Sequence, residues 1–138
     1  MSSNGASPSR ALLLAELEGS ERFLLATHEN PDGDALGSLV GMHGVLSALG
    51  KDSVMFIGAD EFPLPYEYRF FDLDGLQSTP PDDLDERTVV FLDCGNIDRN
   101  PADALKAEDT RILNIDHHQV IARRRPALDG VRAWVVLT

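Results

Sequence analysis

The chain has 138 residues, the size of a single domain, and 43% of them are hydrophobic while 25% are charged. These fractions are typical of a folded domain and argue against intrinsic disorder. The formal net charge is −11, so the surface repels polyphosphate, and binding of duplex nucleic acid through a basic surface is not expected.

Composition also bears on the compartment. The single cysteine, Cys94, excludes an internal disulfide and suits a reducing environment. No apolar run has the length needed to cross a bilayer, and the first ten residues lack the apolar core of a signal peptide. We therefore expect a cytoplasmic protein that does not contact a membrane.

The first half of the chain alternates between polar and apolar segments. Residues 1–9 are rich in Ser, Asn, Gly and Pro and are predicted to be disordered. A helix is predicted over Arg10–Leu17, with Gly19 as its stop signal. The apolar run Arg22–His28 then predicts a buried strand, and a loop containing Pro31 follows it.

A second helix is predicted from Asp34 to Leu49, because apolar residues recur there at helical spacing and Gly50 follows. Glycine is unfavourable inside a helix, so the three that lie within it need an explanation. We expect Gly37, Gly41 and Gly44 to allow close packing of the helix backbone against a sheet.

Three further apolar runs predict strands over Asp52–Gly58, Arg87–Gly95 and Thr110–His118. A short helix is predicted between the last two, over Asn100–Ala107, and a helical turn near Tyr66–Phe71 within the long connection 59–86. Continuous apolar strands separated by helices indicate an α/β fold. We predict a doubly wound, mostly parallel sheet with helices on both faces.

The segment 60–98 is strongly acidic. It carries eleven carboxylates but only two arginines, Arg69 and Arg87. Most of these carboxylates are predicted to form a solvated acidic face. The exceptions are acidic residues at the ends of strands.

Three strands change abruptly at their ends from apolar residues to residues that bind metals. His28 ends the first and is followed by Asp32 and Asp34, whereas Asp93 ends the third. The fourth ends with the run Asp116, His117 and His118. Because ligands bind beyond the carboxyl ends of strands in open α/β sheets, we expect these groups to converge on one edge.

The combination of Asp and His suits Mn²⁺, Fe²⁺ or Zn²⁺. Clustered carboxylates stay ionised together only when cations are present. Two metals about 3.5–4 Å apart are a common device for attack on phosphorus, and Asp93 is the natural bridge between them. The alternative is structural: Asp34 caps the helix, Asp32 makes a turn with Gly33, and His28 and Asp93 have only local roles.

Two further groups are predicted to be structural. His43 lies on the apolar face of its helix and is expected to be partly buried with a hydrogen-bond partner. Cys94 is expected to be a small buried residue beside Asp93, because the neighbouring histidines are better explained as metal ligands than as a base for a nucleophile.

Three ordered motifs resemble those of the DHH phosphoesterases: "THENPDGDALGS", "VVFLDCG" and "NIDHH". The match covers about Arg22 to His118, and the first motif resembles the RecJ-like group of nano-RNases and pAp phosphatases. The resemblance implies hydrolysis of short oligonucleotides, pAp or linear and cyclic dinucleotides by a metal-bound hydroxide. It thus implies a small nucleotide or short single-stranded substrate, and it is compatible with a homodimer.

The resemblance also implies a centre of two Mn²⁺ ions, with Mg²⁺, Co²⁺ or Fe²⁺ as alternatives. One ion would be bound by His28, Asp32 and Asp93. The other would be bound by Asp34, the bridging Asp93 and His117. In this scheme His118 contacts the substrate phosphate, and Asp116 orients His117.

The domain boundaries follow from the same comparison. Residues 10–118 correspond to the DHH domain, and residues 119–138 are a divergent tail, either a linker or an added strand. The family's fourth motif and its C-terminal substrate domain have no counterpart in these 138 residues. The alternative to an active enzyme is therefore a non-catalytic module that binds a metal or a nucleotide.

Overall fold

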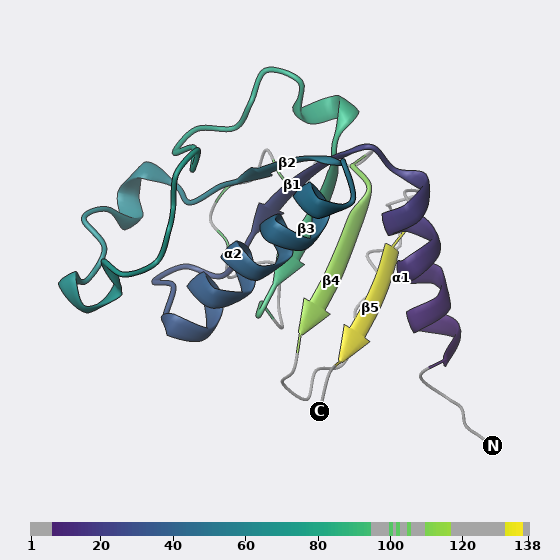
Figure 1. Cartoon of the computed structure of the whole chain (residues 1–138), viewed down its shortest axis with the longest axis horizontal. Helices are drawn as coiled ribbons and strands as arrows, with labels where there is room; N and C mark the ends of the chain where they lie inside the picture. Colours follow the sequence, from purple (N-terminus) through teal and green to yellow (C-terminus); the bar gives the residue numbers. More distant parts are fainter. Residues whose placement is uncertain are drawn as a thin grey trace.

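The computed structural model describes residues 7–94, 110–116 and 132–136, together with residues 100, 102 and 105. Within them, five strands form one sheet in the order β2-β1-β3-β4-β5, and each neighbouring pair is parallel (Figure 1). The strands are β1 (Arg22–Ala26), β2 (Asp52–Met55), β3 (Thr88–Leu92), β4 (Ile112–Asp116) and β5 (Arg132–Val136). The predicted α/β fold with a parallel sheet is therefore confirmed.

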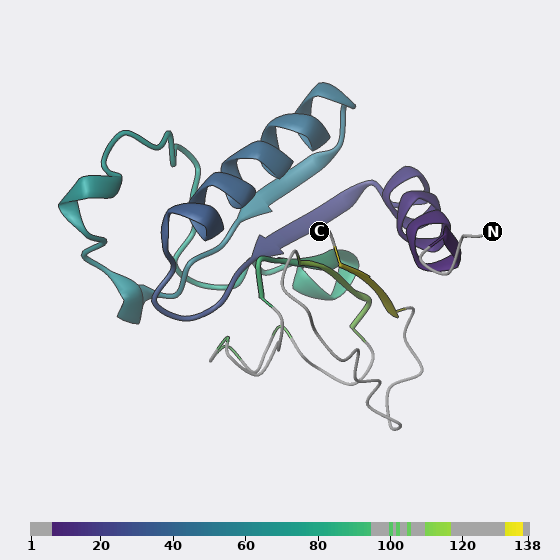
Figure 2. The same ribbon diagram turned by 90° about the horizontal axis from the view of Figure 1, so that it is seen from below.

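Two α-helices lie in the described part of the chain, α1 (Ser7–Gly19) and α2 (Gly33–Ala48). The helix α2 covers one face of the sheet, where it contacts β1, β2 and β3, whereas α1 packs beside β5 (Figure 2). On the opposite face, Leu105 is buried, and its N–H donates to the carbonyl of Ala102. The rest of the predicted helix 100–107 lies outside the described residues.

Side chains of the central strands alternate between two apolar clusters, as a sheet covered on both faces requires. Phe23 and Leu25 of β1 enter the cluster beneath α2. Leu24 and Ala26 enter the cluster on the other face, with Cys94 and Leu105. Both sets are fully buried.

The long connection between β2 and β3 holds three short 3₁₀ helices, Ala59–Glu61, Tyr66–Tyr68 and Leu84–Glu86. The middle one confirms the helical turn predicted near Tyr66–Phe71. In both ribbon views the first part of this connection lies beside the N-terminal end of α2 (Figures 1 and 2). Asn30 N–H donates to Glu61 Oε1 (3.0 Å), which joins the two loops.

Several predicted boundaries were wrong. The strands end earlier than predicted, at Ala26, Met55, Leu92 and Asp116. The first helix begins at Ser7, inside the segment predicted to be disordered. The apolar runs continue beyond the paired residues because the segments after β1 and β2, including Thr27 and Ile57, are buried as well. Residues 132–136, within the tail 119–138, form the strand β5.

The explanation predicted for the helical glycines was also wrong. A Cβ built on Gly41 or Gly44 meets nothing within 4 Å, and both residues are exposed. A Cβ on Gly37 would lie 3.7 Å from Phe71, a residue of the long connection and not of the sheet. The glycines therefore do not bring the helix backbone close to the sheet.

Candidate metal centre

His28 lies two residues beyond β1, with its side chain only 7% exposed. Its Nδ1 is 2.6 Å from the carbonyl oxygen of Glu29. A carbonyl can only accept a hydrogen bond, so Nδ1 carries the proton and donates. In the neutral ring, Nε2 then keeps a lone pair for a metal, the state in which histidine acts as a ligand.

Asp93 follows β3 directly, and its side chain is 2% exposed. Its N–H donates to the carbonyl of Ile115 (3.0 Å) and so continues the bonding between β3 and β4. Its φ is +53°, a left-handed conformation that Asp adopts more readily than most residues but that still carries strain. The chain leaves the sheet at this residue.

Asp32 is the N-cap of α2, and its Oδ1 accepts a hydrogen bond from Ala35 N–H (2.9 Å). The predicted alternative gave this role to Asp34, and that assignment was wrong. Asp34 instead lies in the first turn of the helix, where a carboxylate favours the positive end of the helix dipole. The capping oxygen of Asp32 also lies near the imidazole of His28.

These three side chains form one cluster. His28 Nε2 lies 3.8 Å from Asp32 Oδ1 and 3.7 Å from Asp93 Oδ2. One donor atom from each residue lies within 4.8 Å of the other two. The separations are too long for hydrogen bonds, but they suit ligands that surround a cation at metal–ligand distances of about 2.1 Å. A neutral imidazole and two carboxylates also form a donor set that fits Mn²⁺, Fe²⁺ or Zn²⁺.

The position of the cluster follows from the strand order. Connections from β1 run to β2 on one side, and those from β3 run to β4 and β5 on the other. The order therefore reverses between β1 and β3, and His28 and Asp93 follow these two strands. Doubly wound sheets bind their ligands at this switch point, beyond the carboxyl ends of the strands.

The other predicted site residues have different outcomes. Asp34 is exposed and is not part of the three-residue cluster. For Asp116 only the backbone is described, as the last residue of β4, next to the strand that leads to Asp93. His117 and His118 lie outside the described residues. A second metal site that involves these residues therefore stays a prediction.

The burial predicted for His43 and Cys94 is confirmed. His43 is partly buried, and its Nδ1 lies 3.1 Å from Ser53 Oγ in a hydrogen bond. Cys94 is fully buried in the cluster of apolar side chains that faces away from α2.

Three buried polar residues beside the cluster were not predicted from the sequence to have a role. Thr27 Oγ1 donates to the carbonyl of Leu92 (2.6 Å), and Asn100 Nδ2 donates to the carbonyl of Thr27 (2.7 Å). Asn114 Nδ2 donates to the carbonyl of Cys94 (2.8 Å). A sequence signal was available for Asn114, which interrupts the apolar run of its strand.

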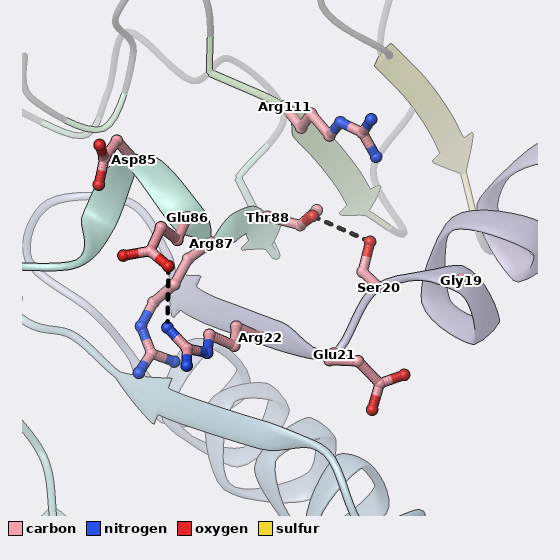
Figure 3. A pocket seen from close by; sticks show the side chains of 9 residues that line it. All are labelled: Gly19, Ser20, Glu21, Arg22, Asp85, Glu86, Arg87, Thr88 and Arg111. Atoms are coloured by element: carbon pink, nitrogen blue, oxygen red, sulfur yellow. Dashed lines mark hydrogen bonds and ion pairs between the residues drawn. The ribbon is translucent and has the colours of Figure 1, made fainter.

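The opposite edge of the sheet holds a polar cleft of about 300 Å³ (Figure 3). Three arginines line it, Arg22, Arg87 and Arg111, each of them paired with a carboxylate. Arg87 is the most buried, and it donates to Asp83, to Asp52 and to the carbonyl of Phe23. Because carboxylates already neutralise these arginines, the cleft is better explained as a structural ion-pair cluster than as a phosphate site.

The pKa shifts fit this structural role. The hydrogen bond from Arg87 lowers the pKa of Asp83 below its ordinary value, against a smaller effect of burial. Burial alone would lower the pKa of Arg87, but its hydrogen bonds to Asp83 and Asp52 outweigh burial and raise that pKa. Both ions are thus held in their charged forms.

Comparison with known proteins identifies the family. The model of the DHH family, N-terminal domain, matches residues 22–133, which include β1 to β4 and every residue of the metal cluster. The chain belongs to the DHH family. The resemblance of its three motifs is therefore confirmed, and a metal cluster built on the first two agrees with the metal dependence of this family.

Two similar proteins are both longer than this chain. It is 34% identical over 110 residues to the bifunctional oligoribonuclease and PAP phosphatase NrnA of Thermus thermophilus, which is 78% of this chain and 31% of that protein. The solved structure of an exopolyphosphatase-related protein from Bacteroides fragilis has the same fold, with a TM-score of 0.59 and 17% identity. That match covers 94% of this chain and 39% of the other. This DHH chain thus spans less than two fifths of the length of either protein.

Among the described residues of the DHH chain, no helix combines the length and apolar character needed to cross a bilayer.

Proposed function

We propose that this chain carries the metal-binding half of a phosphoesterase site that acts on small nucleotides. The observation that supports this most strongly is the cluster of His28, Asp32 and Asp93 at the switch point of a DHH-family sheet. The substrate class follows from the Thermus relative, an oligoribonuclease and PAP phosphatase. Short oligonucleotides, pAp and linear or cyclic dinucleotides are the candidates. Such small substrates agree with a strongly acidic chain, because the metal ions would supply the positive charge that binds them.

A divalent cation fits the cluster, and Mn²⁺ is the first candidate, in a pair of ions as the family motifs imply. When bound, such ions polarise the phosphoryl oxygen and lower the pKa of a water molecule that attacks phosphorus. Asp34, Asp93 and His117 are proposed to hold the second ion. Asp116 and His118 are proposed to orient His117 and to contact the phosphate, respectively.

The described residues contribute binding and orientation. Donation from Nδ1 of His28 to the Glu29 carbonyl fixes the tautomer and turns Nε2 toward both carboxylates. The hydrogen bond from Ala35 fixes Oδ1 of Asp32 at the helix N-terminus. Asp93 is almost fully buried, so water competes little for its carboxylate.

The test measures binding and turnover of the same preparation. Purified chain with Mn²⁺ is incubated with pAp and with a two-nucleotide RNA, and product is separated by ion-exchange chromatography. Phosphate release or cleavage that Asp93→Ala abolishes supports the enzyme, whereas Asp60→Ala is the matched control because Asp60 is an exposed carboxylate outside the metal cluster.

Two outcomes contradict parts of the proposal. Nucleotide and Mn²⁺ binding without turnover favours the second candidate, a non-catalytic binding module, which the short span of this chain relative to NrnA makes a specific alternative. Unchanged Mn²⁺ binding by Asp93→Ala rules out a metal centre built on that residue.

A further inference from the structure

The side chains of Thr27, Asn100 and Asn114 each donate a buried hydrogen bond to a main-chain carbonyl. Each reaches a main-chain carbonyl directly beside a residue of the metal cluster. Thr27 precedes His28, whereas Leu92 and Cys94 lie on either side of Asp93, and all three carbonyls accept from a buried side chain. These carbonyls lie at or just beyond the ends of β1 and β3, where a buried carbonyl needs a hydrogen-bond donor as much as it does inside the sheet.

The geometry at Asp93 shows why such bonds are needed there. The main-chain bond from Asp93 N–H to the Ile115 carbonyl lies at the end of the pairing between β3 and β4, and the left-handed φ of +53° then turns the chain away. A strained residue keeps its conformation only when its surroundings hold it. Thr27 holds the carbonyl before Asp93, and Asn114 holds the carbonyl after it.

The bond from Thr27 also sets the spacing between two ligands. The last paired residues of β1 and β3 are Ala26 and Phe91. One residue further along, the Thr27 hydroxyl spans the two strands to the Leu92 carbonyl at 2.6 Å. His28 and Asp93 are the next residues along the chain after Thr27 and Leu92, so this bond fixes their backbones relative to each other immediately before the cluster.

Asn114 is an unusual residue for its place. It is 5% exposed and is flanked by Leu113 and Ile115 in a central strand. Among the described residues its Oδ1 has no hydrogen-bond partner, although its Nδ2 donates to Cys94. A buried amide oxygen without a partner costs free energy, so any stabilising contribution of the Asn114 side chain must come from the hydrogen bond that its nitrogen donates.

We propose that Thr27 and Asn114 are positioning residues for the metal centre. Their hydrogen bonds to the carbonyls of Leu92 and Cys94, together called the brace, support the backbone on both sides of Asp93. They thereby hold the Asp93 carboxylate at a separation from His28 at which both can bind one metal ion. This inference rests on the proposed metal centre. Asn100 extends the brace, since it holds the Thr27 carbonyl through Nδ2 and anchors itself through Oδ1, which accepts from Ala102 N–H.

The structure offers a matched control for Thr27. Thr88 is also buried, also belongs to a central strand segment, and its hydroxyl bonds to Ser20 Oγ (3.1 Å). It lies at the start of β3, at the opposite edge of the sheet from the metal cluster. Thr27→Val and Thr88→Val therefore remove one buried hydroxyl each with the same change of shape.

The experiment measures Mn²⁺ affinity from the electron paramagnetic resonance signal of the free ion, together with the thermal denaturation of each metal-free variant. We expect both valine variants to lower Tm to a similar extent. Of the two, only Thr27→Val should weaken Mn²⁺ binding, by about 10- to 100-fold, as for other groups that orient metal ligands.

Thr27→Ser keeps the hydroxyl and should restore most of the affinity. Asn114→Leu, which removes the donor at similar volume, should also weaken binding, and it tests the brace if Thr27→Val fails to fold.

The possible failures are distinguishable. If Asp93→Asn loses Mn²⁺ but Thr27→Val and Asn114→Leu bind it as tightly as the unmodified chain, the brace is wrong and the metal centre stands. Equal weakening by Thr27→Val and Thr88→Val shows a general effect of stability and also overturns the brace. If the unmodified chain binds no more Mn²⁺ than Asp93→Asn, the metal centre is wrong, and the brace falls with it.

Discussion

Asp32 combines two roles that the sequence presented as alternatives. The same oxygen that caps α2 through Ala35 N–H lies 3.8 Å from His28 Nε2. A carboxylate oxygen has lone pairs for both a hydrogen bond and a metal. Capping therefore does not argue against metal binding, and the helix fixes the direction of the carboxylate toward the cluster.

The two roles can be separated by substitution. Asp32→Asn keeps an oxygen that can cap the helix but loses the charge, so we expect unfolding free energy within a few tenths of a kcal/mol of the unmodified chain and clearly weaker Mn²⁺ binding. Asp32→Ala should lose the cap as well and cost about 1 kcal/mol. Urea denaturation without metal and Mn²⁺ titration measure the two effects, and equal stability of both variants would contradict the capping role.

The ion pair of Asp83 with Arg87 gives stability that depends on pH. The pKa of Asp83 is lowered from 3.8 in the folded chain by the hydrogen bond from Arg87. A carboxyl with a lowered pKa binds its proton more weakly in the folded than in the unfolded state. Its contribution is therefore fully present well above pH 3.8 and is lost as the pH falls through the lower, folded value.

Replacement of Asp83 by Asn should reveal this dependence, because the amide oxygen can still accept from Arg87 but carries no charge. We expect Asp83→Asn to be less stable than the unmodified chain at pH 7 and the difference to shrink as the pH falls below 3.8. Denaturation by urea across this range measures it, with the exposed neighbour in Asp82→Asn as the control. A difference that does not change with pH would exclude the proposed ion-pair origin.

At the scale of the element, two exposed glycines lower the stability of α2. Gly41 and Gly44 are exposed helix positions with open space where a Cβ would lie. Glycine in a helix interior costs about 0.5–1 kcal/mol relative to alanine, mainly through backbone entropy. Gly50 beyond the helix differs, because its φ of +76° suits glycine and strains other residues.

Alanine substitutions at these glycines should have opposite signs. We expect Gly41→Ala and Gly44→Ala each to raise the free energy of unfolding by about 0.5–1 kcal/mol. The matched control Gly50→Ala, at a position equally free of steric contact, should lower it by about 1 kcal/mol. Urea denaturation of the three variants tests this, and a loss of stability at Gly41 or Gly44 would point to a contact that the helix needs there.

At the scale of the whole molecule, the metal cluster joins segments that are far apart in sequence. His28 and Asp32 come from the loop between β1 and α2, and Asp93 follows β3 after the long connection. An ion bound only by the folded chain therefore stabilises the complete arrangement of these segments. At a concentration 100 times its dissociation constant the gain is about 2.7 kcal/mol.

Metal addition and removal should accordingly shift thermal denaturation. We expect saturating Mn²⁺ to raise Tm by roughly 10 °C for a domain of this size, and EDTA to reverse the shift. Asp93→Asn should abolish the response while it still folds, because asparagine is well suited to the left-handed conformation at this position. Calorimetry measures the shift, and an equal response of Asp93→Asn would place the bound ion elsewhere.

Much of the fold was predictable because local patterns carry it. Continuous apolar runs such as Arg22–Ala26 and Thr88–Leu92 are typical of strands buried on both faces, and the spacing of Leu36, Leu39 and Leu46 is typical of a helix on a core. The exact ends of these elements were less predictable. Buried residues such as Thr27 and Ile57 continue the apolar pattern after strand pairing has stopped.

The chemistry of the candidate site follows from residue types and their spacing along the chain. The three motifs supplied imidazole and carboxylate groups at strand ends, and they identified the family before any contact was known. Which of these groups meet, and which hydrogen bonds hold them in place, depends on how the strands pair. Strand order brings His28 and Asp93 to one switch point, and Asn114 reaches Cys94 from a neighbouring strand. Such contacts depend on pairing between segments distant in sequence, which local periodicity does not encode.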